Sequence, residues 1–489
     1  MRFVKSDYEI LVTLKLDFAQ VARATGQHLC NVCIKYNKNG SAKSWPRGER
    51  VVNTNAGATL NEQRTHVRWF PILFMVLIGT TINYLDRAVF GIARVGGMQE
   101  DLGLNAVQIG YLGAAFSLTY AFAQIPGGVF LDRFGTRVTY GLSLFSWSLF
   151  TAAQGMAGSF ATMFGYRLGM GLCEAPCFPA NSRILATWFP QGERARANSI
   201  YAVGQYAGLA FLSVPLVWIT SEFGWRALFL IAGLGGMLFA FYFYGKYHEP
   251  NDSKIANQAE LDHIEAGGGL APKVARVKFS FKNLASVFRR RQILVASAAM
   301  FCGNTVLVFF LIDFINYLGS ERDMQFLQAG IWGALPYIAA ALGVLCGGQL
   351  SDYLLRKTGS ANIGRKVPIT LGFIMASVIV FAALVPKGSD GNVIVIAIMC
   401  VAFFGQGITN LGWTVISDVA PKELIGMSGG VFNFITNLAG ILTPILIGYI
   451  LFYTTSYAAA LVYVGSMPLI GALLYIFVLG DIKRLSVVE

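Results

Sequence analysis

The sequence predicts an all-α integral membrane protein with twelve transmembrane helices, arranged as two pseudo-symmetric six-helix bundles. The chain is strongly apolar, with a mean hydropathy of +0.55 and 55% hydrophobic against 13% charged residues, which argues against an ordinary soluble domain. Twelve stretches have the roughly 20 mostly apolar residues that a spanning helix needs. A motif that follows the second stretch recurs after the eighth, as expected if one six-helix unit was duplicated.

The predicted spans lie at about 69–93, 106–127, 138–158, 160–186, 198–220, 225–246, 291–318, 324–351, 368–386, 392–417, 426–452 and 456–479. The expected domains are an N-terminal extension (1–67), an N-terminal bundle (68–247), a cytoplasmic linker (248–290), a C-terminal bundle (291–481) and a cytoplasmic tail (482–489). Within the linker, Phe279–Phe288 precedes three arginines and is expected to form an amphipathic helix on the inner membrane surface. The extension is polar and is open to three interpretations: a small cytoplasmic appendage, an unstructured tail, or an artefact of start-site choice.

The net charge of +12 is distributed unevenly along the chain. Lysines and arginines gather in alternate connections between the spans, and the intervening loops are poor in them. By the positive-inside rule, both termini and the long central linker are expected to be cytoplasmic. Because the basic residues set the topology in this way, they give no reason to expect a nucleic-acid partner.

Five of the seven cysteines fall inside predicted spans, where cysteine packs as a small apolar residue, so the sequence implies no disulfide framework. The other two, Cys30 and Cys33, lie near His28 in the extension. A single CxxC without a second pair is a weak metal signal. We therefore expect no metal site and no cofactor.

The first span carries two charges, Asp86 and Arg87, well inside an apolar helix. An ionised residue at the centre of a spanning helix costs about 2.5–3.5 kcal/mol on insertion scales, so such residues usually face the bundle interior and have a function there. Successive positions are about 100° apart, so the two side chains can border one cavity without sharing a helix face. Their functional interpretation is an acid that takes up protons beside a cation that binds an anion. The structural alternative is a pair that neutralises itself near a helix end.

The fourth span carries a second charged set, Arg167 and Glu174. Seven residues are nearly two helical turns, which places both on one face about 10 Å apart along the axis. A buried pair that can exchange partners would suit a proton switch, with Arg167 favouring the ionised form of Glu174. The alternative is a static salt bridge.

The repeated motif follows the second span of each half. It reads Gly128-x-x-x-Asp132-Arg133-x-Gly135-x-Arg137 in the first half and carries Asp352 and Arg356 in the second, where Asp352 lies 220 residues after Asp132. Glycine lets helices approach closely, and basic residues near a helix end can hold the aspartate. We expect a cytoplasmic latch that forms and breaks, whereas a simple tight turn would need the glycine but not the charged residues.

These features resemble the major facilitator superfamily. More narrowly, they resemble its anion:cation symporter branch and, within it, the bacterial D-glucarate/D-galactarate permeases, with the D-galactonate permeases as close relatives. The resemblance covers about 68–484. Its motifs are Asn83-Tyr-x-Asp-Arg87, Gln124-Ile-Pro-Gly-Gly128, Glu174-Ala-Pro-x-Phe-Pro179, Trp188-Phe-Pro190, Ile264-Glu-Ala-Gly-Gly268, Ala420-Pro-Lys-Glu423, Ser428-Gly-Gly-x-Phe-Asn433 and Gly480-Asp-Ile-Lys-Arg484.

The resemblance implies roles for individual residues. The acids matching Asp86 and Glu174 would carry the protonation chemistry, and Arg87 would meet the substrate carboxylate. Hydrogen bonds to the sugar-acid hydroxyls would come from Tyr120, Gln205 and Asn433, with Asn304 and Trp413 as weaker additions. Tyr120, Gln205 and Asn433 could each equally be satisfied by an interhelical hydrogen bond.

One stretch departs from the pattern of these relatives. Where they commonly have Thr-Trp-Phe-Pro late in the seventh span, this chain reads Ile312-Asp313-Phe314-Ile315. An extra acid near the outer mouth would oppose the entry of an anion unless it is paired or protonated. We therefore expect Asp313 to have a partner or to alter the external gate.

The expected function is secondary active transport in the inner membrane: symport of a D-glucarate/D-galactarate-class anion with protons into the cytoplasm by alternating access. The expected partners are the organic anion and the lipid bilayer, and the protein is expected to be a monomer. The alternatives are symport of another organic anion (D-galactonate, hexuronate, tartrate- or phthalate-like) and a non-transporting membrane sensor. An enzyme is not expected, because no nucleophile–base set is apparent and the four histidines lie outside the predicted spans.

Overall fold

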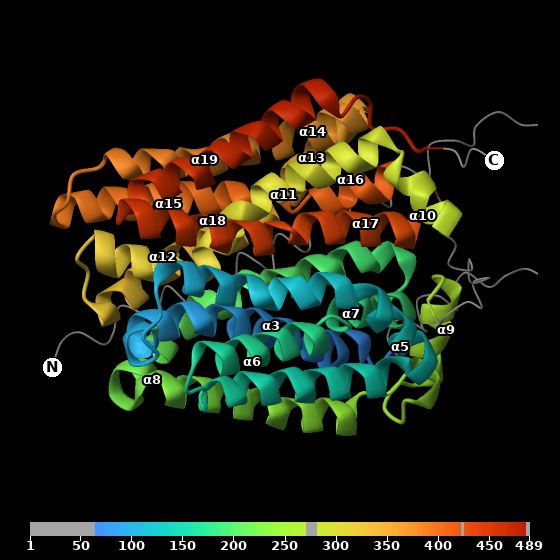
Figure 1. The fold of residues 1–489 in the computed structure, drawn as a ribbon. Coiled ribbons are helices and arrows are strands. Elements are labelled where there is room, and N and C mark those ends of the chain that lie inside the picture. Colours follow the sequence, from blue (N-terminus) through green and yellow to red (C-terminus); the bar gives the residue numbers. More distant parts are fainter. Residues whose placement is uncertain (1–63, 270–280, 422–424, 486–489) are drawn as a thin grey trace, which may run out of the picture. The chain divides into compact units, whose positions relative to one another are not determined.

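The computed structural model describes residues 64–269, 281–421 and 425–485 (Figure 1). All the regular structure in these ranges is helical. The N-terminal extension up to residue 63, with the expected Cys30–Cys33 motif, and the start of the expected amphipathic helix lie outside the described residues.

The helices of the first half are α3 (Leu73–Ala93), α4 (Gln99–Asp101), α5 (Ala106–Gln154), α6 (Phe160–Glu174), α7 (Cys177–Trp188) and α8 (Gln191–Lys246). The linker contains α9 (Gln258–Ala266) and α10 (Phe281–Phe288). The second half consists of α11 (Arg291–Ile312), α12 (Phe314–Asn316), α13 (Phe326–Thr358), α14 (Ala361–Ser377), α15 (Ser389–Thr409), α16 (Gly412–Val419), α17 (Ile425–Asn437), α18 (Ala439–Thr454) and α19 (Tyr457–Leu473). Short π-helical turns flank α3 at Arg68–Ile72 and Arg94–Met98.

Two of the long helices each contain two predicted spans. The chain reverses within α5 at Gly135 (φ +77°) and within α8 at Gly224 (φ +80°). Such positive φ angles are in the left-handed region that disfavours residues with a Cβ, so glycine is needed at both turns. The glycine of the repeated motif therefore has a structural reason in the first half.

In the described part of the chain, nine helical segments are long and apolar enough to cross a membrane. The segment at Arg196–Lys246 is one of the nine and contains two of the predicted spans. The predicted spans at 138–158 and 160–186 correspond to the second limb of α5 and to α6 with α7. The described helices thus accommodate all twelve predicted spans, although length and composition alone identify nine segments.

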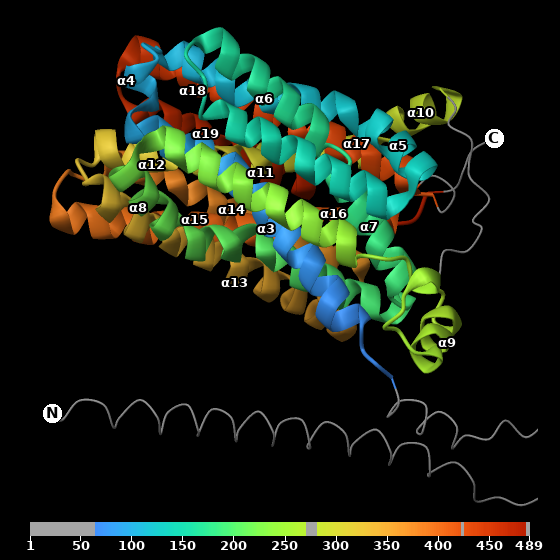
Figure 2. The same ribbon diagram turned by 90° about the horizontal axis from the view of Figure 1, so that it is seen from below.

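The halves contact each other through two equivalent pairs of helices. Helix α5 packs on α18, and α8 packs on α13 (Figures 1 and 2). Close approach needs small residues: a Cβ on Gly110 of α5 would lie 2.5 Å from the carbonyl oxygen of Pro444. The same holds between α3 and α11, where a Cβ on Gly91 would lie 2.6 Å from the carbonyl oxygen of Leu311.

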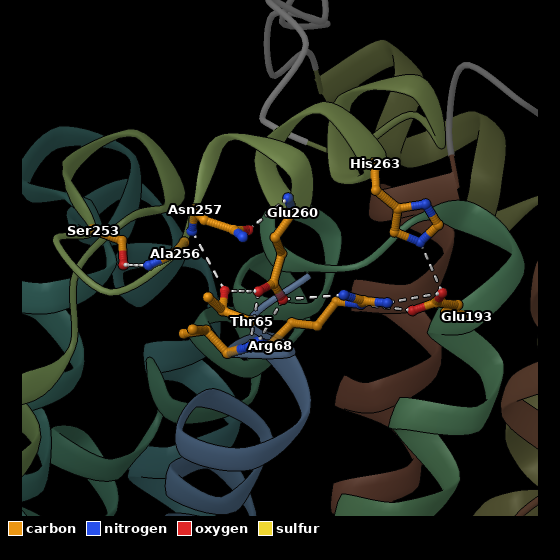
Figure 3. Close-up of polar contacts among 9 residues, drawn as sticks. Thr65, Arg68, Glu193, Ser253, Ala256, Asn257, Glu260 and His263 are labelled. Carbon is orange, nitrogen blue, oxygen red and sulfur yellow. Dashed lines mark hydrogen bonds and ion pairs between the residues drawn. The ribbon is translucent and has the colours of Figure 1, made fainter. Parts of the chain in front are cut away.

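The linker helix α9 is attached to the start of the first span by a buried polar cluster, drawn in Figure 3. The Glu260 carboxylate accepts hydrogen bonds from the backbone N–H groups of Val67 and Arg68, from the hydroxyl of Thr65 and from the Arg68 guanidinium. Arg68 also binds Glu193 at 2.8 Å. Burial opposes the ionisation of Glu260, but these donors outweigh it, so the pKa of Glu260 is lowered.

Candidate functional site

The centre of the site is an ion pair between the first and fourth spans. Nε and Nη2 of Arg87, on α3, donate to Oε1 of Glu174, at the end of α6, at 2.8 and 2.5 Å. The Glu174 side chain is fully buried, and that of Arg87 is 14% exposed. Both donors bind the same oxygen, and Oε2 of Glu174 has no hydrogen-bond partner among the described residues.

Three aromatic rings surround the Arg87 guanidinium. Its Cζ lies 5.1 Å from the ring centroid of Tyr84, 4.9 Å from Phe116 and 4.7 Å from Tyr120. The faces of aromatic rings attract cations, most strongly where water is excluded. The rings therefore help to keep the guanidinium charged and to fix the plane of its donors.

Asp86 lies on a different side of α3 from its neighbour Arg87. Its side chain is fully buried, and its Oδ2 accepts a hydrogen bond at 2.9 Å from the indole Nε1 of Trp147, in the second limb of α5. Asp86 and Arg87 thus have separate partners. The alternative in which these two residues neutralise each other is not the arrangement in this structure.

The expected pair between Arg167 and Glu174 is not formed in this structure, where Glu174 is held by Arg87, and a role of Arg167 in proton exchange stays a prediction. Arg167 instead donates to backbone carbonyls of α5, from Nε to Leu112 at 2.5 Å and from Nη2 to Gly113 at 3.5 Å. Its Cζ also lies 4.1 Å from the ring centroid of Phe90. Spacing on α6 could not reveal that the neighbouring helices provide closer partners for both residues.

The other expected substrate residues have different surroundings. Tyr120 is buried next to Arg87, and Gln205 on α8 is 9% exposed. In the second half, Asn304 of α11 donates from Nδ2 to the Thr436 carbonyl of α17 at 3.1 Å. Oδ1 of Asn433 accepts from Asn437 at 2.9 Å, whereas Trp413 is 43% exposed and its ring packs edge-on against Phe432.

The repeated motif forms ion pairs inside each half. Asp132 lies 3.7 Å from Arg183 of α7, and Asp352 lies 3.6 Å from Arg365 of α14. Other motif residues make local contacts: Arg137 donates to the Tyr244 carbonyl at 2.7 Å, Arg356 donates to the Asp352 carbonyl at 3.3 Å, Arg133 stacks on Phe134, and Gly128 has open space around it. A role of these pairs in gating stays a prediction.

Asp313 has the partner that its position required. Its Oδ1 lies 2.6 Å from Nη1 of Arg94, and both side chains are almost fully buried. Arg94 follows α3 in the first half, and Asp313 follows α11 in the second. The departure from the relatives' pattern thus creates a buried ion pair between the two halves.

Sequence reasoning missed Trp147 and the rings of Tyr84 and Phe116. A tryptophan inside an apolar span raises no signal by itself, and its donor role depends on which helix lies beside it. Asn83 is fully buried, with neither amide atom hydrogen-bonded within the described ranges. The sequence did offer one sign of Asn83 as a site residue, because it is a polar residue in an apolar helix, three positions before Asp86.

Among residues 64–269, 281–421 and 425–485, no group of three or more His, Cys, Asp or Glu side chains could hold a metal ion.

Comparisons with known proteins agree with the fold and extend over most of the chain. Residues 76–444 match the model of the Major Facilitator Superfamily. The "Probable galactarate/D-glucarate transporter GudP" of Escherichia coli K12 is 41% identical over 439 residues, covering 87% of this chain and 96% of that protein. The "D-galactonate transporter" of Escherichia coli O6:H1 is 39% identical, covering 87% and 99%. A crystal structure of a D-xylose–proton symporter shares the fold, with a TM-score of 0.66 at 15% identity, covering 85% and 98%.

Proposed function

Because this chain belongs to the Major Facilitator Superfamily and is a multi-pass membrane transporter, we propose that it imports a sugar-acid anion of the D-glucarate/D-galactarate class together with protons. The names of the relatives at 41% and 39% identity support the substrate class. The two halves would alternate in opening the site to either side of the membrane. The distribution of basic residues supports cytoplasmic termini. The direction of import would follow from an inward proton gradient.

The observation that carries the proposal is the buried Arg87–Glu174 pair. A protonated Glu174 is neutral and holds the guanidinium less strongly, which frees its donors. A substrate carboxylate can then take the place of Glu174, because a guanidinium offers two parallel N–H groups to a carboxylate. Protonation and substrate binding would in this way favour the same state of the protein, which is what coupling requires.

Asp86 would carry a second proton. Its buried carboxylate accepts a hydrogen bond from the indole of Trp147. Asp86 directly precedes Arg87, the partner of Glu174, in the chain. A dianionic sugar acid crossing the membrane against the potential costs about 2.3 kcal/mol per charge for each 100 mV. Accompanying protons cancel that cost, so two titrating acids suit a dianion.

D-Galactonate is the second candidate substrate. It has one carboxylate, and Arg87 as observed offers a binding place for one carboxylate. The relative named as a D-galactonate transporter supports this alternative. Competition experiments rank the candidates, because two sugar acids that share a site displace one another according to their affinities.

The test is uptake of radiolabelled D-glucarate into proteoliposomes that contain the purified protein. An inside-alkaline pH gradient should drive accumulation above equilibrium, and unlabelled galactarate should compete at least as well as D-galactonate or a hexuronate. Uptake that is indifferent to the gradient would contradict proton coupling. Stronger competition by a hexuronate than by galactarate or D-galactonate would contradict the substrate class.

A further inference from the structure

The two acids of the site share a feature: one oxygen of each carboxyl group is bound by donors that cannot accept a hydrogen bond. Oε1 of Glu174 receives both donors of Arg87, and Oδ2 of Asp86 receives the indole N–H of Trp147. The second oxygens, Oε2 of Glu174 and Oδ1 of Asp86, are buried and have no hydrogen-bond partner among the described residues.

At Asp86, the chemistry of indole favours protonation of Oδ1, the oxygen without a hydrogen-bond donor. An indole nitrogen donates one hydrogen bond and has no lone pair to accept one. A proton placed on Oδ2 would compete with the indole N–H for the lone pairs of that oxygen and would leave a hydroxyl oxygen, which is a weaker acceptor than a carbonyl oxygen. A proton placed on Oδ1 leaves Oδ2 as a carbonyl oxygen that continues to accept from Trp147. A serine, threonine or tyrosine at this position could reverse its hydroxyl and would allow either oxygen to take the proton.

The position of Trp147 is fixed by the register of two helices. Tyr140 and Trp147 are seven residues apart on α5, and they meet Gly79 and Asp86, which are seven residues apart on α3. A Cβ on Gly79 would overlap the Tyr140 hydroxyl, so glycine permits the close approach. Trp147 itself is fully buried, and its ring lies edge-on to that of Tyr140 at 6.4 Å. The indole N–H is thus held in place from one side by packing and from the other by Asp86.

We infer that Trp147 is a positioning residue for proton coupling, which holds Oδ2 of Asp86 so that Oδ1 is the atom that gains and loses the proton. The step adds one proton to Oδ1 of the carboxylate and gives a neutral carboxylic acid, and its reversal returns that proton to the cytoplasmic side. The inference rests on the proposed proton-coupled transport. The groups that act on Asp86 are Glu174 on α6, itself paired with Arg87, and the neutral side chains of Trp147 and Thr151 on α5. The Thr151 hydroxyl donates its hydrogen bond to the Trp147 carbonyl at 3.1 Å, whereas the indole N–H is the donor to Oδ2 of Asp86.

The first test is the pH profile of net uptake for Trp147→Phe, with Trp188→Phe as the matched control. Trp188 is also fully buried, but its indole nitrogen has no hydrogen-bond partner in the described part of the chain. Loss of the indole donor destabilises the ionised form of Asp86 relative to the protonated form. Asp86 should therefore keep its proton to a higher pH in Trp147→Phe. The half-maximal pH of uptake should rise by about one to two units in Trp147→Phe and stay unchanged in Trp188→Phe.

Counterflow exchange in the same vesicles shows whether Trp147→Phe is folded and binds substrate, because exchange does not require the site to return empty. The second test works on the intact wild-type protein and does not depend on that variant. Of the eight tryptophan indole ¹⁵N–¹H resonances, one should shift with pH, and the shift should vanish in Asp86→Asn.

Either of two results would overturn the inference. One is an unchanged pH profile in a folded Trp147→Phe protein, and the other is a set of eight indole resonances of which none changes with the protonation of Asp86. The proposed function fails separately: uptake by the wild-type protein would then show no pH dependence, while the indole resonance would still report on Asp86.

Discussion

At the scale of single residues, the site consists of charges whose partners lie on other helices. Asp86, Arg87, Arg167 and Glu174 could be identified as candidate site residues because apolar spans rarely contain ionisable residues. Their pairing could not be predicted, because spacing along one helix says nothing about what the neighbouring helix presents. Glu174 was expected to bind Arg167 on its own helix and instead binds Arg87 of α3.

Replacing Asp86 by asparagine should abolish pH-driven accumulation. The amide keeps the shape of the side chain and can still accept from Trp147, but it cannot take up and release a proton. Accumulation should fall to the level that wild-type vesicles reach without a gradient, at equal amounts of inserted protein. Normal accumulation by this variant would remove Asp86 from the coupling mechanism.

Replacing Arg87 by lysine should weaken substrate binding although the charge is retained. The guanidinium gives two N–H groups to one carboxylate in this structure, and an ammonium group cannot reproduce that geometry. Loss of one charge-assisted hydrogen bond costs about 1.5–3 kcal/mol, which is about 10- to 150-fold in affinity. Calorimetry on purified protein measures the substrate affinity, with the surface variant Arg226→Lys as control. Unaltered affinity in Arg87→Lys would mean that Arg87 has only a structural role.

At the scale of helices and their connections, two buried ionic contacts join parts of the chain that are far apart in the sequence. Arg94 and Asp313 join the ends of α3 and α11 across the two halves. Glu260 joins the linker helix α9 to the start of the first span. The sequence signalled Asp313 as an acid that needed a partner. It gave no sign of the Glu260 contacts, which depend on the path of the linker.

Replacing Asp313 by asparagine should favour the opening of the halves at this end. Removal of one partner leaves Arg94 buried without a counter-charge, which costs about 3–5 kcal/mol in the state where the pair is formed. The double variant Arg94→Gln/Asp313→Asn should be less affected than the single one. A cysteine introduced at Ile109, near the pair, reports opening through its labelling rate by a membrane-impermeant maleimide. Equal labelling with and without Asp313 would show that the pair does not restrain the halves.

Replacing Glu260 by glutamine should lower the apparent melting temperature at neutral pH. The lowered pKa of Glu260 means that its stabilising contribution is present above the unfolded-state pKa of about 4.3 and is lost as the pH falls through the folded-state pKa. The wild-type advantage over Glu260→Gln should therefore disappear on acidification. Glu265→Gln, which removes an exposed charge from the same helix, is the control. A difference that persists at low pH would contradict the electrostatic origin.

At the scale of the whole molecule, hydropathy and the repeated motif were sufficient to predict the fold class, because lipid permits few alternatives to apolar helices. The sequence predicted a reversal between the two spans of α5 and between the two spans of α8, but the form of each reversal needed the structure, in which the chain turns at a positive φ angle at Gly135 and at Gly224. The contacts between the halves likewise depend on glycines whose neighbours lie far away in the sequence, such as Gly110 against Pro444.

The central claim is that a sugar acid and protons cross the membrane together, and proton movement driven by the substrate tests it most directly. Proteoliposomes loaded with a pH-sensitive dye, with no imposed pH gradient, receive D-glucarate or galactarate on the outside. The interior should acidify as the sugar acid enters, and vesicles with Asp86→Asn should give no such signal. Entry of labelled substrate without any change in internal pH would contradict the account.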